Sequence, residues 1–392
     1  MDLETGPASI QRFPRWLAIL LVLGLLGGGL WYRSRSADAP TSPTARVGSS
    51  TGETPAAVLD GDDIVEVVPA DSIPAIDDPR FIELSQAVWL SDLEPVIAVD
   101  LGGEARAYPL QIMTWHEIVN DTIGATPIAV TFCPLCNTAI AFERPTIDGE
   151  VTTFGTSGKL INSNLLMYDR ATESLWPQVT GVALRGPMKG EALTRLSALI
   201  VSWRDFKDAF PDGVVLSRDT GFVRRYGDNP YPGYDNIDSA PFLYSGEVDG
   251  RLAAVERIIG VNHVGDQLAF PYFRLRERAS GGVSVAQDRV GSLPVVVFWQ
   301  KGTTSALDRT EISVSRDVGS AAAFSRRLGD KMLRFTVQDG ALVDTQTRSR
   351  WNLFGRATAG RLRGQRLLPA QATDSFWFNW AAFYPDTEVW GQ

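Results

Sequence analysis

The sequence has few of the residues that carry most metal and redox chemistry. Among its 392 residues there are two cysteines and two histidines. A structural zinc site made of cysteines alone is excluded, because a closed tetrahedral site needs four ligands and there is no third cysteine. Any metal site must therefore combine the two thiols with other residue types.

Clusters of basic residues are also missing. The chain has 37 lysines and arginines against 46 aspartates and glutamates, spread without long runs of either sign. A nucleic-acid-binding face needs clustered positive charge to neutralise phosphates. We therefore expect no nucleic-acid partner.

Two segments of the chain lack common catalytic motifs. The segment "GTSGKL" lacks the spacing of a phosphate-binding loop, and "LINSNLLM" includes no serine in a Gly-x-Ser-x-Gly turn. The sequence therefore assigns no enzymatic reaction. It is 44% hydrophobic and 10% aromatic, which is enough apolar material for sizeable packed cores in a globular protein.

An uncharged apolar stretch from Trp16 to Tyr32 follows Arg12 and Arg15. It is long enough for the core of a signal peptide or a short membrane helix, and Ala37-Asp38-Ala39 fits a small-x-small cleavage site. No cysteine follows the stretch, which excludes a lipoprotein anchor there. We expect a single N-terminal pass in the cell membrane with an extracytoplasmic domain, or a secreted or periplasmic protein if the segment is cleaved.

The chain is predicted to divide into four parts. Residues 1–35 form the signal or membrane segment, and residues 36–60 are rich in Ser, Thr, Pro, Ala and Gly, which predicts a disordered tether. Residues 61–256 are predicted to hold a first repeat and a turn-rich bridge. Residues 257–392 are predicted to be a second, degenerate repeat.

Ordered sequence matches support this internal duplication. "IAVDLGGEARAYPL" from Ile97 matches "IGVNHVGDQLAFPY" from Ile259, and "LMYDRATESLW" ending at Trp176 matches "ALVDTQTRSRW" ending at Trp351. The offsets between matching segments drift slowly and the order is kept, which indicates two copies of one unit. Within each copy, short β-branched stretches alternate with turns and a closing aromatic helix follows. We predict an α+β fold, mainly β, with a few short helices.

The two copies differ at the residues with the most chemistry. Cys133 corresponds to Gln300 and Cys136 to Thr303, so the second copy lacks both thiols. Met167 corresponds to a leucine, and His116 falls opposite an arginine in a poorly aligned stretch. Positions that differ in this way can carry a function that only one copy has.

Four segments of the first copy carry a family resemblance. They are "WHEIVND", "TFCPLCNTAIAF", "FGTSGKLINSNLLMYDRATESLWPQ" and "LSALIVSWRDFKDAFPD". The sequence resembles the bacterial and archaeal family called domain of unknown function 3179 over most of residues 60 to 390. The resemblance implies an extracytoplasmic, membrane-associated protein whose family motif includes Cys133 and Cys136, and it implies little about activity.

The sequence around the cysteines predicts a hairpin. "PIAVTF" and "TAIAF" are β-rich, so Cys133 and Cys136 are expected at the tip of a tight turn between two strands. Two thiolates on such a turn can bind one metal ion. His116, on a short helix leading into the cysteine strand, is the best third ligand, and the fourth position is left to water, substrate, Met167 or Glu117. Soft ligands favour copper(I), and zinc with an open position is the other candidate.

Other interpretations of the same residues stay open. The cysteines can form a thiol–disulfide redox pair of the cell envelope, or a disulfide that staples a scaffold or binding module. His116 can be a hydrogen-bonded structural histidine, and Met167 can be a core residue. Glu117, Asn120 and Asp121 can be a solvated helix end. The loop "GTSGKLINSN" is predicted to form a polar rim beside the cysteine hairpin.

Overall fold

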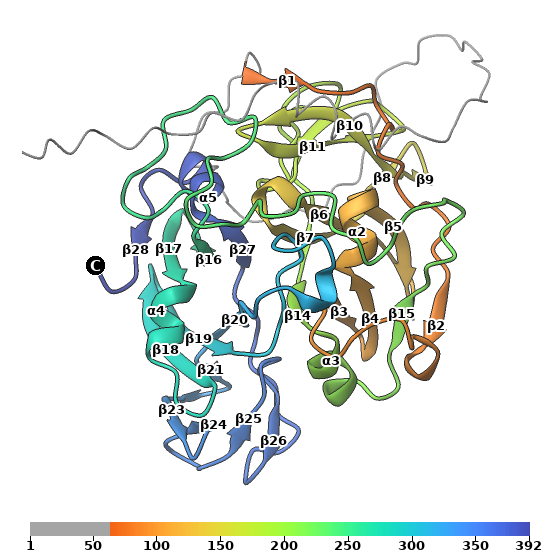
Figure 1. The fold of residues 1–392 in the computed structure, drawn as a ribbon. Coiled ribbons are helices and arrows are strands. Elements are labelled where there is room, and N and C mark those ends of the chain that lie inside the picture. The colour runs from red at the N-terminus through yellow and green to blue at the C-terminus, as the bar shows by residue number, and fades with distance from the viewer. Residues whose placement is uncertain (1–62) are drawn as a thin grey trace, which may run out of the picture. The chain divides into compact units, whose positions relative to one another are not determined.

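The computed structural model describes residues 63–392, which Figure 1 shows as a ribbon. The predicted membrane segment and tether lie outside these residues. Within the described part, none of the helices has the length and apolar character needed to cross a membrane. This part is mainly β with a few short helices, as the sequence predicts.

A first group of elements occupies residues 95–216. Short elements precede it: β1 (Val65–Glu66), β2 (Phe81–Glu83) and η2 (Leu84–Gln86). The group contains, in chain order, β3 (Pro95–Leu101), β4 (Glu104–Pro109), α2 (Leu110–His116), β5 (Ile118–Ile123), β6 (Thr126–Cys133), η3 (Pro134–Cys136), β7 (Thr138–Glu143), β8 (Thr146–Ile147), β9 (Glu150–Val151), β10 (Phe154–Ile161), β11 (Asn164–Asp169), β12 (Leu175–Pro177), β13 (Arg195–Leu196), β14 (Leu199–Ser202), α3 (Trp203–Ala209) and β15 (Val214–Leu216).

A second group occupies residues 257–389. It contains β16 (Arg257–His263), β17 (Asp266–Pro271), α4 (Tyr272–Glu277), β18 (Val283–Val290), β19 (Leu293–Gln300), η4 (Ile312–Val314), β20 (Ser320–Ser325), β21 (Arg327–Leu328), β22 (Lys331–Met332), β23 (Phe335–Gln338), β24 (Ala341–Asp344), β25 (Arg350–Trp351), β26 (Ala357–Ala359), β27 (Ala372–Phe376), α5 (Trp377–Phe383) and β28 (Glu388–Val389).

The strands of the two groups pair in the same way. In the first group β3 is antiparallel to β4 and β14, β15 runs parallel to β4, and β5, β6 and β7 form a meander. In the second group β16 is antiparallel to β17 and β27, β28 runs parallel to β17, and β18, β19 and β20 form a meander. The order and pairing of elements therefore occur twice, while the predicted domain boundaries stay a prediction.

A buried polar motif also occurs twice. Asp169 accepts hydrogen bonds from the backbone N–H of Thr172 at 2.7 Å and from the indole N–H of Trp176 at 2.9 Å. Asp344 makes the same two kinds of bond to the threonine and tryptophan that follow it, at 2.6 and 3.1 Å. Each aspartate ties a strand to the turn after it, so this part of the matching sequence serves the scaffold.

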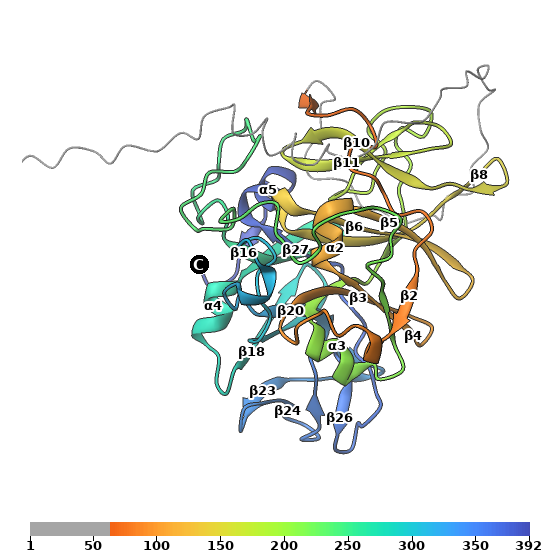
Figure 2. The same cartoon turned by 45° about the vertical axis from the view of Figure 1, so that its right-hand side comes forward.

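The two groups share a hydrophobic core. One buried cluster joins Val96 and Trp203 of the first group to Phe298 and Phe324 of the second. Residues 217–256, here called the bridge and drawn in green in Figure 1, connect the groups through a series of turns. Figure 2 shows α3 above the sheet that contains β23, β24 and β26.

Candidate functional site

The cysteines lie where β6 turns into β7. Cys133 is the last residue of β6 and pairs with Thr138 of β7, which confirms the predicted hairpin. The connection is a single 3-10 turn, Pro134–Cys136, which the sequence did not predict. Proline suits the first position of such a turn because its missing N–H would have no partner there. Asn137 then ends the turn in the left-handed conformation, with φ 51°.

The two thiols are free and converge on one backbone oxygen. Cys136 Sγ lies 3.2 Å from the carbonyl oxygen of Ser163, and Cys133 Sγ lies 3.8 Å from the same atom. The amide of Asn164 donates to Cys136 Sγ at 3.6 Å. Ser163 and Asn164 belong to the segment "GTSGKLINSN", which therefore lies beside the hairpin as expected. The prediction that this segment is a loop is wrong, because its first seven residues belong to β10 and only Asn162 and Ser163 form a turn.

Both thiols are shielded from solvent. Cys133 is 2% exposed and Cys136 is fully buried. Burial raises the pKa of the Cys136 thiol well above its ordinary value, and the neighbouring Cys133 raises it further. Cys136 therefore stays protonated at neutral pH until a partner or base takes its proton.

A buried amide network holds the hairpin in place. Gln178 donates to the Thr131 hydroxyl and to the Thr138 carbonyl, each at 2.9 Å, and accepts from Asn164 at 3.2 Å. The network reaches β6, β7 and β11 from one side chain. The position of Asn164 beside the thiols is fixed at both ends of its side chain, because its amide nitrogen donates to Gln178 and its amide oxygen accepts from the backbone N–H of Val179 at 3.1 Å.

Glu117 is the feature of this region that the sequence least anticipated. It follows α2 with φ 58°, a conformation that non-glycine residues rarely adopt. The interpretation of Glu117, Asn120 and Asp121 as a solvated helix end is wrong, since all three are buried. The reason is that the chain passes from α2 directly into β5, a strand of the meander that carries the cysteines.

The carboxyl of Glu117 has no hydrogen-bond or ion-pair partner among the described residues. Burial raises its pKa to about 8. Its charge also acts on the pKa of Cys136, which places it in the electrostatic field of the thiols. A partnerless buried carboxyl on a strained backbone is typical of a functional position.

His116 is hydrogen-bonded at both ring nitrogens. Nδ1 lies 2.7 Å from the carbonyl oxygen of Pro74, so this nitrogen carries the proton, and Nε2 accepts from the hydroxyl of Tyr226 at 2.6 Å. Burial lowers the pKa of His116 to about 4. The ring is thus neutral, and its bonds are those of a structural histidine, one of the two roles that the sequence left open.

The residues predicted to bind copper or zinc come together only in part. Cys133 and Cys136 form a pair, whereas His116 is bonded to Pro74 and Tyr226, and Met167 is fully buried in β11, where it pairs with Trp176. Across residues 63–392 no three His, Cys, Asp or Glu side chains are grouped so as to hold a metal ion. Metal binding by these residues stays a prediction.

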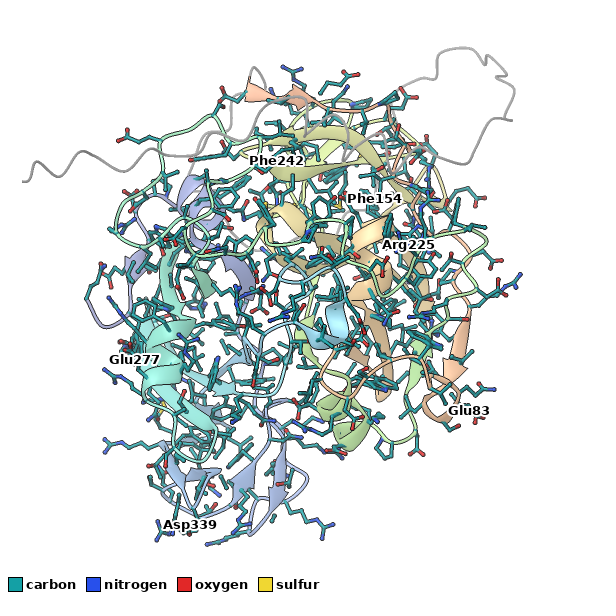
Figure 3. All side chains as sticks on the ribbon, viewed as in Figure 1. Glu83, Phe154, Arg225, Phe242, Glu277 and Asp339 are labelled. Atoms are coloured by element: carbon teal, nitrogen blue, oxygen red, sulfur yellow. The ribbon has the colours of Figure 1, made fainter. Side chains whose placement is uncertain are left out.

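The bridge covers the thiols. The hydroxyl of Tyr234 donates to the carbonyl oxygen of Leu135 at 2.8 Å, and the Ser163 hydroxyl donates to the carbonyl oxygen of Phe242 at 2.5 Å. Burial raises the pKa of Tyr231, and the charges of Glu117 and Cys133 raise it further. Figure 3 labels Phe242 in this region. The sequence predicted a turn-rich bridge but not this cover, because the cysteines lie about 100 residues before the bridge, beyond local patterns.

Comparison with known proteins returned one match. Neither a curated protein nor a solved structure matched the chain. The family resemblance seen in the sequence is confirmed: a family model described as "Protein of unknown function (DUF3179)" matches residues 70–387, and the chain belongs to this family.

Proposed function

We propose that Cys133 and Cys136 form a redox-active dithiol that exchanges electrons with a disulfide. The observation that carries this proposal is the convergence of two free thiols, held on one 3-10 turn, on the carbonyl oxygen of Ser163. The two thiols also interact directly, since a hydrogen bond with Cys133 is among the causes that raise the pKa of Cys136.

The exchange balances with a disulfide as the oxidant. The sulfur of Cys133 attacks one sulfur of the partner disulfide and releases the first partner thiolate. The sulfur of Cys136 then attacks Cys133 in the mixed disulfide, which forms the Cys133–Cys136 bond and releases the second partner thiolate. Two electrons pass to the partner, and the two thiol protons end on the partner's sulfurs. Cys133 is assigned the first attack because Cys136 is the more deeply buried thiol.

Glu117 is proposed as the group that takes the proton of Cys136, because its charge acts on the pKa of that thiol. Its carboxyl has no other partner, and a pKa of about 8 allows both protonation states near neutral pH. The bridge must move for a partner disulfide to reach the thiols, because Cys133 is only 2% exposed. We further propose an extracytoplasmic location, which rests on the N-terminal segment of the sequence and suits disulfide chemistry.

A thiol count across a glutathione redox series tests the proposal. The full chain is equilibrated at each ratio of reduced to oxidised glutathione, unfolded, alkylated and weighed by mass spectrometry. We expect both thiols to disappear together in a two-electron transition, and Cys136→Ser to accumulate a mixed disulfide at Cys133. Thiols that stay reduced at every ratio, or a disulfide that no ratio reduces, would sink the proposal.

Metal binding is the second candidate, and the same convergence of sulfurs favours it. Two thiolates directed at one point match the soft ligands that copper(I) prefers. Anaerobic competition of the full chain with a chromogenic copper(I) chelator tests this, with Cys133→Ser as the control. A copper content that also falls in His116→Ala would support the three-ligand set predicted from the sequence. No retained copper in the wild-type chain would remove this candidate.

A further inference from the structure

A second site, separate from the thiols, lies where the two groups of elements meet. A cavity of about 220 Å³ is lined from the first group by Asp100 of β3, Leu199 of β14 and Phe210, which directly follows α3. The second group contributes Phe324 of β20 and the segment around β26. Figure 2 shows α3 close above the sheet to which β26 belongs. The cavity is smaller than the roughly 300–1,000 Å³ of pockets for drug-sized ligands.

Three phenylalanine rings contribute to the walls of the cavity. The rings of Phe210 and Phe354 meet edge to face, with centroids 4.9 Å apart, and join the two groups directly. Phe354 is half-buried, whereas Phe324 is almost fully buried. Such walls favour the flat or apolar body of a ligand.

Two arginines stand side by side at the cavity. Arg356 and Arg366 face each other in an isolated antiparallel bridge, so like charges lie directly across a strand pair, which is an unfavourable arrangement. Arg366 forms an ion pair with Asp100. The guanidinium of Arg356 has no hydrogen-bond or ion-pair partner among residues 63–392, which leaves one positive charge uncompensated at the cavity.

The first group shows that the scaffold does not need these arginines. The positions 174 residues earlier are Val182 and Ala192, which form the same isolated antiparallel bridge. The fold therefore closes this turn with two small apolar side chains. The arginine pair is a property of the second group alone, as the thiols are of the first.

Asp100 has a carboxylate oxygen that lacks a hydrogen-bond donor among the described residues. One of its carboxylate oxygens pairs with Arg366, while the other, Oδ1, is buried without a hydrogen-bond partner. A buried acceptor without a donor is costly. The cavity thus presents an unpaired cation in Arg356 and an unpaired acceptor in Asp100 beside apolar walls.

We propose that this cavity binds a small carboxylate with an apolar body. The carboxylate pairs with Arg356, in the geometry that a guanidinium offers to planar anions, and the body packs on Phe210, Phe324 and Phe354. A ligand that also carries a hydroxyl or amine group supplies the donor that Asp100 Oδ1 lacks. This site is independent of the proposed thiol chemistry.

Calorimetric titration of the full chain with phenylacetate tests the proposal. The buffer is Tris chloride at low ionic strength, because salt screens the charge of Arg356. Phenylacetamide is the matched neutral ligand. We expect saturable binding of phenylacetate in the millimolar range or tighter, and binding of the amide that is weaker by about tenfold or more. Wild-type chain that binds neither ligand, or both equally, would overturn the proposal without any variant.

Two variants identify the residue involved. Arg356→Val installs the residue that the first group has at this position, and we expect it to weaken phenylacetate binding by about tenfold or more. Arg363→Val, at an exposed arginine of the same segment, is the control and is expected to bind as wild type. Equal binding by Arg356→Val and wild type would place the ligand elsewhere and overturn the assignment. Circular dichroism of both variants shows that they are folded.

Discussion

The hydroxyl of Tyr226 donates a hydrogen bond of 2.6 Å to Nε2 of His116. This bond ties the bridge to the end of α2, and Thr220 continues the chain of bonds at 2.6 Å from the same hydroxyl. The helix end and the bridge are therefore held to each other by a neutral histidine. The bridge also covers the thiols. The hydrogen bond therefore links the access of reagents to Cys133 with the protonation state of His116.

Tyr226→Phe should make the thiols easier to reach. The variant loses the hydrogen bonds to His116 and to Thr220, each of which contributes about 1 kcal/mol, so a local opening equilibrium shifts by about fivefold or more. We expect the folded variant to react with N-ethylmaleimide about fivefold faster than wild type, or more. Tyr244→Phe is the control, since the Tyr244 hydroxyl bonds within the bridge, to the carbonyl oxygen of Glu247. Equal labelling rates in wild type and Tyr226→Phe would show that these bonds do not hold the cover.

Acid should weaken the fold through His116. The pKa of this ring is about 4 in the folded protein against 6.5 ordinarily, so the unfolded chain binds more protons between these values. The contribution of His116 to the free energy of unfolding should therefore decrease as the pH falls from about 6.5 to 4, by up to about 1.4 kcal/mol per pH unit. Urea unfolding of wild type and His116→Gln across this range measures it. Compared with wild type, His116→Gln should lack this loss of stability towards low pH; identical slopes in the two proteins would contradict the assignment.

Glu117 should have the opposite effect at higher pH. Its pKa is raised to about 8 from 4.5, so the folded protein keeps a proton that the unfolded chain has lost. The contribution of Glu117 to the free energy of unfolding should therefore fall as the pH rises from about 4.5 to 8, and between about 4.5 and 6.5 it opposes the contribution of His116. Glu117→Gln removes this titration, and we expect it to flatten the decrease and to be relatively more stable at pH 8 than at pH 5. A wild-type slope that the substitution leaves unchanged would mean that Glu117 is ionised in the folded state.

Glu117→Gln also distinguishes an effect of Glu117 on stability from a role in thiol–disulfide exchange. If Glu117 takes the proton of Cys136, Glu117→Gln should slow the second step of exchange and accumulate the mixed disulfide at Cys133. Rapid-quench alkylation after mixing with a disulfide measures this species over pH 6 to 9, an interval of about one to two units around the carboxyl pKa. If Glu117→Gln is more stable than wild type but carries out thiol–disulfide exchange at the wild-type rate, Glu117 lowers the stability of the fold and takes no part in the exchange.

Local sequence patterns were sufficient for most elements near the site. The β-rich stretches around Cys133 and Cys136 predicted the hairpin, and the Gly, Ser and Asn content of residues 155–164 predicted the rim that supplies Ser163. The short helix ending at His116 was also expected from its neighbours. These features depend on periodicity and turn chemistry, which a single segment contains.

The missed features depend on contacts between distant segments. Glu117 is buried because the chain enters β5 without a loop and the bridge, with Tyr231, packs over the region more than 100 residues later. The charge left on Arg356 follows from its pairing with Arg366 and from the ion pair that Asp100 makes with the latter. Neither relationship has a local signature, so only the folded arrangement reveals it.

Asp169→Asn and Asp344→Asn should destabilise the chain by similar amounts. Each aspartate accepts from a threonine N–H and a tryptophan N–H, and an asparagine replaces one charged acceptor oxygen by a donor that faces these groups. Hydrogen bonds to charged groups contribute about 1.5–3 kcal/mol, so we expect a loss in this range for each variant in urea unfolding. The double variant should show the sum of the two losses, since the motifs share no partner. A loss for one aspartate and none for the other would mean that the repeated geometry does not carry the same energy in both groups, and that the duplicated scaffold has diverged in its folding as well as in its thiols.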